Sequence, residues 1–169
     1  TLKQEDMVQR GHAIEVRIYA EEPSANFMPS SGQIVYMKEP EGPGVRLDNG
    51  VFSGWNVPVH YDPILSKLIV WGPDREASRR RMVNALRDFA ILGVSTTVEF
   101  LAKALEHPDF IGGQTYTDFI DKNFPGGKVP DEDNGRLNLA LAAAAIAETV
   151  AHSPAQSNGS QAAVRTFDP

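Results

Sequence analysis

Arg17 is the residue whose type and position first point to chemistry in this sequence. It lies in the run Glu15-Val16-Arg17-Ile18, so Glu15 projects from the same side of an extended strand. An always-charged, forked guanidinium is suited to holding an oxyanion in an active site. The same spacing fits an ordinary surface ion pair that contributes little to stability. The residues alone leave both interpretations open and favour the surface pair.

Five arginines that follow Asp74 invite a second interpretation, the binding of a phosphate. Acidic residues are interleaved with them, so we expect a solvated helix face instead. The five are Arg75, Arg79, Arg80, Arg81 and Arg87.

The sequence lacks the other common catalytic motifs. Its four histidines do not fall at metal-ligand spacing, and it has no glycine-rich phosphate loop, Walker lysine or Gly-x-Ser-x-Gly elbow. With no cysteine, disulfides and thiolate sites are excluded. The net charge of −6 argues against a nucleic-acid partner. No apolar run approaches the roughly 18 residues of a membrane span. We therefore expect no metal site and no partner among nucleic acids or membranes.

The first seventy residues contain the predicted strands. Residues 10–20 alternate between apolar and polar side chains, which indicates a strand with one apolar face. Residues 33–37, 57–61 and 64–71 are further strand candidates. The Asn49-Gly50 pair predicts a two-residue hairpin turn.

Helical periodicity replaces this pattern after Gly72-Pro73. We expect one helix capped by Asp74 and ended by Gly93, and a second that starts at Thr96 with a capping box to Glu99. A shorter helix is expected after Gly112-Gly113, containing Phe119, Ile120 and Phe124 and stopping at Pro125. Strands first and helices afterwards favour an α+β fold, with an antiparallel β-rich N-terminal two fifths followed by packed helices.

The C-terminal stretch differs in composition. Residues 136–151 are rich in alanine and predict a helix on propensity alone. Residues 153–163 are polar and read as a linker. We expect a connector over 126–152 and a flexible tail or linker over 153–169. Because the first residue is Thr1, we also expect this chain to be a piece of a longer one.

Several separated motifs resemble, in order and spacing, the C-terminal domain of biotin carboxylase. The resemblance covers about residues 8–125, implies a domain over 1–125 of the rudiment single hybrid type, and implies that the ATP-grasp and biotin carrier domains of the family are absent. The motifs are Arg10–Pro23, Phe27–Gly32, Pro43–Asp48 and Tyr61–Ile69, continued by Asn84–Leu86, Gly93–Thr96 and Thr117–Ile120.

The resemblance implies a ligase component that uses ATP, Mg²⁺ and bicarbonate to carboxylate biotin on a carrier domain of an acyl-CoA carboxylase. The nucleotide and its metal would be bound mainly by the ATP-grasp part. Implied partners are that ATP-grasp domain, the carrier domain, a second copy in a homodimer and a carboxyltransferase subunit. The isolated chain would be inactive, and the enzyme would be cytoplasmic, or in the mitochondrial matrix of a eukaryote.

The motif match also assigns site residues. Arg17 is similar to the arginine that stabilises the enolate-like oxygen of biotin, which reverses the preference for a surface ion pair. Thr117 falls at the edge of the adenine pocket. Asp62 matches an acidic position near the site, although an Asp before Pro63 also fits a turn cap. Pro43 and Arg46 match the dimer interface.

Two alternatives stay open at this point. The domain could be a non-catalytic module of the same subunit that serves dimerisation or carrier docking. It could also come from a pyruvate carboxylase, which His12 and Tyr19 disfavour.

Overall fold

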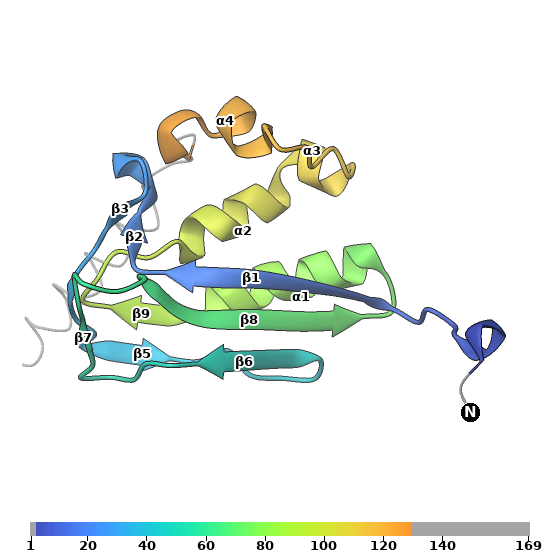
Figure 1. The fold of residues 1–169 in the computed structure, drawn as a ribbon, viewed down its shortest axis with the longest axis horizontal. Coiled ribbons are helices and arrows are strands. Elements are labelled where there is room, and N and C mark those ends of the chain that lie inside the picture. Colours follow the sequence, from blue (N-terminus) through green and yellow to red (C-terminus); the bar gives the residue numbers. More distant parts are fainter. Residues whose placement is uncertain (1–2, 130–169) are drawn as a thin grey trace, which may run out of the picture. The chain divides into compact units, whose positions relative to one another are not determined.

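A three-stranded antiparallel sheet organises the first half of the chain. In this computed structural model, which describes residues 3–129, β1 (His12–Tyr19) and β6 (Val45–Asn49) flank the central β8 (Ile64–Gly72) (Figure 1). The strands predicted over 10–20 and 64–71 are confirmed. The alanine-rich stretch 136–151 and the polar tail lie outside the described residues.

Three short ribbons surround this sheet. Each of their strands has only two or three residues. The single strand predicted over 33–37 is instead two short strands, β4 (Gly32–Gln33) and β5 (Tyr36–Lys38). The pairs are β2 (Glu21–Glu22) with β3 (Met28–Pro29), β4 (Gly32–Gln33) with β7 (Asn56–Val57), and β5 (Tyr36–Lys38) with β9 (Ala90–Leu92). Short 3-10 turns lie at Gln4–Asp6, Pro23–Ala25 and Pro125–Gly127.

The hairpin predicted at Asn49-Gly50 is wrong. β6 ends at Asn49 and pairs with β8, whereas the chain beyond Gly50 continues to β7, which pairs with β4. The Asn49 side chain accepts the N–H of Val51 at 3.2 Å and donates to the carbonyl of Val51 at 2.8 Å. The asparagine therefore makes a local turn within a longer loop.

Apart from β9, which lies between α1 and α2, the strands precede the helices, and the α+β class is confirmed. Asp74 caps α1 as predicted, because its Oδ1 accepts the N–H of Ala77 at 2.7 Å. The helices are α1 (Arg75–Asp88), α2 (Val98–Glu106), α3 (Pro108–Ile111) and α4 (Phe119–Asn123).

The predicted end of the first helix at Gly93 is wrong. α1 stops at Asp88, and the next residues form β9 against β5. Gly93 has a φ of +112°, and a side chain there would collide with the carbonyl oxygen of Gln33. The glycine thus permits a close approach of two chain segments and does not cap the helix.

The N-cap of the second helix lies one residue later than predicted, and the predicted capping box is absent. Its N-cap is Thr97, whose Oγ1 accepts the N–H of Tyr19 at 3.1 Å, while the N–H of Thr97 donates to the carbonyl of Tyr19 at 3.1 Å. With Thr97 as the N-cap, the residue three positions on is Phe100, so Glu99 cannot complete the capping box predicted from Thr96. The contact of Thr97 with Tyr19 fixes the end of the strand that carries Arg17.

One face of the sheet is buried against α1, and Ser78 on that helix donates to the carbonyl of His12 at 2.7 Å. The main core contains the inward side chains of the sheet and of α1, among them Ile18, Leu68, Val70, Met82 and Leu86. A second cluster joins α2 and α4 through Phe100, Ala104, Phe119 and Phe124. The other face of the sheet is left open for polar side chains.

Candidate functional site

The open face of the sheet brings charged side chains from its three strands together. Arg17 on β1 is the register partner of Lys67 on β8, and Lys67 is in turn the partner of Asp48 on β6. One register step away, Glu15 and Arg46 flank Ile69. Residues that are partners in an antiparallel sheet project from the same face and lie side by side. This face is the candidate site.

Arg17 is the most exposed of the cations in the central row, with 61% of its side chain accessible. Its Nε lies 3.8 Å from Oε1 of Glu15, beyond hydrogen-bond distance. A hydrogen bond to the Tyr19 side chain, followed by the charges of Tyr19 and Glu15, raises the pKa of Arg17. The guanidinium is thus charged and oriented, and it keeps donors for a ligand.

Lys67 and Asp48 were missed by the sequence interpretation. Asp48 is held by Arg46, whose Nε and Nη2 donate to its two oxygens at 2.8 and 3.2 Å. This hydrogen bonding lowers the pKa of Asp48. Lys67 Nζ is 3.7 Å from Oδ2 of the same carboxylate. The register of β1 against β8 would have revealed Lys67, but a single strand pattern does not contain the register.

Asp62 shows the turn-capping contact that its sequence suggested. Its Oδ1 accepts the N–H of Ile64 at 2.9 Å and so helps to start β8. Its charge also reaches the site, since it contributes to the raised pKa of Arg17. Burial, with a smaller effect of Asp62, raises the pKa of the nearby Glu21. Asp62 therefore has a structural role and an electrostatic one.

The remaining predicted site residues lie on the surface. Thr117 is exposed in the segment just before α4. Pro43 is exposed in the loop before β6, where it lines an open groove of about 380 Å³ together with Arg80, Arg81 and other residues. Arg46 is exposed beside Asp48. No contact in the described part of the chain joins Thr117 or Pro43 to Arg17.

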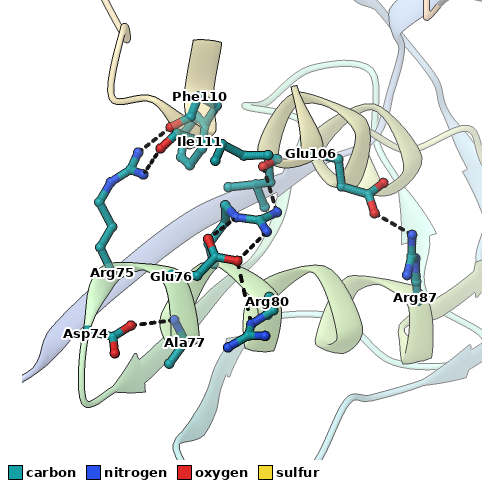
Figure 2. A network of polar contacts seen from close by, with 11 residues as sticks. Asp74, Arg75, Glu76, Ala77, Arg80, Arg87, Glu106, Phe110 and Ile111 are labelled. Atoms are coloured by element: carbon teal, nitrogen blue, oxygen red, sulfur yellow. Dashed lines mark hydrogen bonds and ion pairs between the residues drawn. The ribbon is translucent and has the colours of Figure 1, made fainter. Parts of the chain in front are cut away.

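The arginines of α1 form the predicted solvated face only in part, because Arg80 and Arg87 are exposed whereas Arg79 is buried. Arg75 donates to the carbonyls of Phe110 and Ile111 at 2.6 and 3.1 Å, and its guanidinium lies over the Phe110 ring. Arg87 pairs with Glu106 (Figure 2). These contacts fasten α1 to α2 and α3.

Arg79 is the buried member of this group. Its Nε and Nη2 donate to the two carboxylate oxygens of Glu76 at 2.8 Å each, and its Nη1 donates to the carbonyl of Leu105 at 3.2 Å. Arg80 stays at the surface, 3.6 Å from Glu76. The donors of Arg75 and Arg79 are therefore used by the fold, whereas Arg80 is exposed.

Metal-binding clusters and membrane-spanning helices are both absent from residues 3–129. This range contains no group of three or more His, Cys, Asp or Glu side chains that could hold a metal ion. Within the same range, no helix is long and apolar enough to cross a bilayer.

Comparison with known proteins decides the family. The model of the biotin carboxylase C-terminal domain matches residues 15–122, which include every predicted site residue. The chain belongs to this family. The resemblance to the biotin carboxylase C-terminal domain that the sequence motifs indicated is confirmed.

Individual relatives agree with the family. This biotin carboxylase C-terminal domain is 46% identical over 121 residues to a biotin carboxylase from Nostoc sp., covering 72% of the chain and 27% of the relative. It is 45% identical over 119 residues to a pyruvate carboxylase subunit from Methanothermobacter thermautotrophicus, covering 70% and 24%. The chain thus spans about a quarter of these relatives. The chain matches a biotin carboxylase and a pyruvate carboxylase subunit at similar overall identity.

Solved structures show the same fold. The biotin carboxylase domain dimer of the Hydrogenobacter thermophilus 2-oxoglutarate carboxylase, bound to MgADP and bicarbonate, matches with a TM-score of 0.72 at 34% identity. The match covers 77% of this chain and 29% of that one. A complete pyruvate carboxylase from Rhizobium etli also gives 0.72, at 36% identity, covering 78% and 13%.

Proposed function

We propose that this domain is part of a biotin carboxylase that carboxylates carrier-bound biotin with ATP and bicarbonate, and that Arg17 stabilises the biotin oxygen on which negative charge develops. The observation that carries the proposal is the position of Arg17. It is charged, outward-facing and only loosely paired, on the open face of a sheet within the matched family region.

The chemistry explains why a fixed cation is useful there. When the ureido nitrogen of biotin loses its proton, negative charge moves to the ureido oxygen. A guanidinium already aimed at that oxygen stabilises the charge without reorganising during the reaction. Tyr19 and Glu15, two residues to either side of Arg17 on its own strand, both favour the charged guanidinium. The Arg17 donors fit a developing oxyanion.

The nucleotide and its metal are assigned mainly to an ATP-grasp portion outside this chain. ATP supplies the energy for activating bicarbonate, and Thr117 would contribute to the adenine edge. Asp62 would shape the potential around Arg17 from beside the site.

The proposed partners are the ATP-grasp domain, the biotin carrier domain and the carboxyltransferase subunit. A second copy would contact Pro43 and Arg46, which are exposed on adjoining parts of one loop and strand. The proposed location is the cytoplasm, or the mitochondrial matrix of a eukaryote.

The test replaces Arg17 in a full-length carboxylase that contains this domain. Arg17→Ala is expected to lower biotin carboxylation by about a hundredfold or more, the scale of a lost oxyanion donor. Arg80→Ala, which removes an exposed arginine from α1, is the matched control and should retain activity. Unchanged carboxylation by a folded Arg17→Ala enzyme would contradict the catalytic role and favour the non-catalytic dimerisation or carrier-docking module.

A second test uses the 169-residue chain itself. We expect no carboxylation and no micromolar MgATP binding, because the groups that bind phosphate and magnesium are assigned to another part of the enzyme. Calorimetry that detects micromolar MgATP binding to this chain would contradict that division of labour.

A further inference from the structure

Tyr19, the last residue of β1, is the neighbour of Arg17 on the open face of the sheet. Side chains two positions apart on a strand project from the same face, so the phenol lies beside the guanidinium. A hydrogen bond joins the two side chains. The phenol oxygen is its acceptor, because an arginine side chain has donors only. Glu15, two residues to the other side, stays 3.8 Å from Arg17.

The backbone of Tyr19 is held by one residue at the start of α2. Its N–H donates to Oγ1 of Thr97 at 3.1 Å, and its carbonyl accepts the N–H of Thr97 at 3.1 Å. Thr97 is buried, and its own carbonyl accepts the N–H of Leu101 in the first turn of α2 at 2.9 Å. Both polar groups of the Tyr19 backbone are therefore tied to the buried start of a helix.

The pairing of β1 with β8 changes register at the same residue. Ile18 lies opposite Ser66, but Tyr19 lies opposite Ile64. At this point β8 therefore contributes one extra residue, Leu65, and the ladder contains a bulge. Bulges increase the local twist of a strand pair and re-aim side chains, and they are frequent next to active sites. The direction of the Tyr19 side chain is thus set by this bulge together with the two hydrogen bonds to Thr97.

Arg17 needs a support of this kind to act as a fixed cation. Its side chain is long and 61% accessible, so it would populate many rotamers without a partner. A donor stabilises a developing oxyanion best when it is in place before the reaction begins. Tyr19 is half-buried, its ring has few rotatable bonds and its backbone is held at both polar groups. It is therefore rigid enough to orient a mobile neighbour.

We propose that Tyr19 is a positioning residue for Arg17: its hydroxyl oxygen, anchored through the backbone by Thr97, accepts a hydrogen bond from the guanidinium and holds it in the orientation needed for carboxylation. This inference rests on the proposed function and deepens it, because it assigns a residue that acts through Arg17 and not on the substrate. The contacts run from the buried start of α2 through the end of β1 to the guanidinium.

The activity test replaces Tyr19 in the full-length carboxylase. Tyr19→Phe keeps the ring and removes the acceptor, so kcat for biotin carboxylation should fall about fivefold, the scale of one hydrogen bond, while KM for ATP stays unchanged. In an Arg17→Ala background the same substitution should have no further effect, because Tyr19 acts through Arg17. Tyr36→Phe, which removes an exposed hydroxyl on β5, is the control and should retain full activity. A wild-type kcat for Tyr19→Phe, or an equal loss in both backgrounds, would overturn the positioning role.

NMR of the ¹⁵N-labelled 169-residue chain observes the Arg17 side chain directly. Tyr19→Phe should shift the Arg17 Nε–H resonance and speed its hydrogen exchange, whereas Tyr36→Phe should leave both unchanged. Thr97→Val removes the hydroxyl that accepts the Tyr19 N–H, so it should disturb the same resonance. Thr97→Ser retains that hydroxyl and should restore the wild-type signal.

The two readouts separate this inference from the proposed function. An unchanged Arg17 signal in Tyr19→Phe would overturn the positioning role, even where Arg17→Ala abolishes carboxylation. If Tyr19→Phe shifts the Arg17 signal but Arg17→Ala carboxylates normally, the contact between the two side chains stands and the catalytic role of Arg17 fails.

Discussion

The arginines of α1 and those of the open sheet face carry the same charge and differ in what their donors meet. Arg79 and Arg75 donate to a carboxylate and to backbone carbonyls of α2 and α3 at 2.6–3.2 Å. Arg17 lies 3.8 Å from its nearest carboxylate and is mostly exposed. The first group fastens helices together, whereas Arg17 keeps donors for a ligand.

This difference teaches that donor saturation separates structural arginines from functional ones better than their number does. Five arginines in fourteen residues of α1 look like an anion site in the sequence. The structure directs three of them, Arg75, Arg79 and Arg87, to partners within the domain (Figure 2). The predictions below test this division, from the largest expected effect to the smallest.

The largest effect is expected on activity. Arg17→Lys preserves the charge but removes the forked donor geometry, so carboxylation by the full-length enzyme should fall by about tenfold or more. The midpoint of urea unfolding should stay unchanged, because Arg17 makes no short ion pair. A loss of stability as large as that of an α1 arginine variant would show that Arg17 has a structural role. It would contradict the distinction between Arg17 and the arginines of α1.

The converse change is Arg79→Met. It should lower the free energy of unfolding by about 2 kcal/mol, because it leaves the carbonyl of Leu105 and the carboxylate of Glu76 without their donor. The measurement is urea unfolding followed by circular dichroism. Arg80→Met, one residue away and exposed, should change stability by less than about 0.5 kcal/mol. A loss no larger than that of the control would contradict the structural role of Arg79.

A smaller effect is expected for Arg75→Lys. A lysine keeps the positive charge but cannot donate to the Phe110 and Ile111 carbonyls in the same forked geometry, so stability should fall by about 1 kcal/mol. Hydrogen exchange of the α3 amides should speed up more than that of β8. Uniform exchange changes across the domain would mean that Arg75 does not specifically hold α3.

The sequence already contained a signal that Arg79 is buried, which the interpretation of the five arginines as a solvated face did not use. Arg79 precedes Met82, Val83 and Leu86 by three, four and seven residues, the spacing of one helix face. That spacing already put Arg79 on the buried stripe. Periodicity cannot show which backbone carbonyls face the stripe, because these come from α2, more than twenty residues later.

The sheet shows the same limit. Alternation predicted β1 and placed Arg17 on its polar side, and a nearly continuous apolar run predicted β8. Lys67 became visible only through the register that opposes it to Arg17. The short ribbons were not predicted, because strands of two or three residues are too short to show a periodic pattern of apolar and polar side chains. The expected capping box from Thr96 to Glu99 is absent because the N-cap is Thr97, whose hydroxyl accepts the N–H of Tyr19.

The smallest expected effect is a difference in pH dependence. Hydrogen bonds from Arg79 lower the pKa of Glu76 below its ordinary value of 4.5. Stability from this pair is then fully present above pH 4.5 and is lost as the pH falls through the lower pKa of the folded state. Glu76→Gln should therefore be less stable than the wild type at neutral pH, with a difference that shrinks on acidification.

Asp48→Asn is the matched comparison on the sheet, since Arg46 lowers the pKa of Asp48 below 3.8. Its stability difference should have the same sign and disappear over a lower pH range, but it should be smaller, because this pair is exposed whereas Arg79 is buried. Urea midpoints measured for both variants from neutral to acidic pH give the comparison. An equal or larger effect at Asp48 would mean that the charges of the sheet face also hold the fold together, and Arg17 would lose its distinction from the arginines of α1.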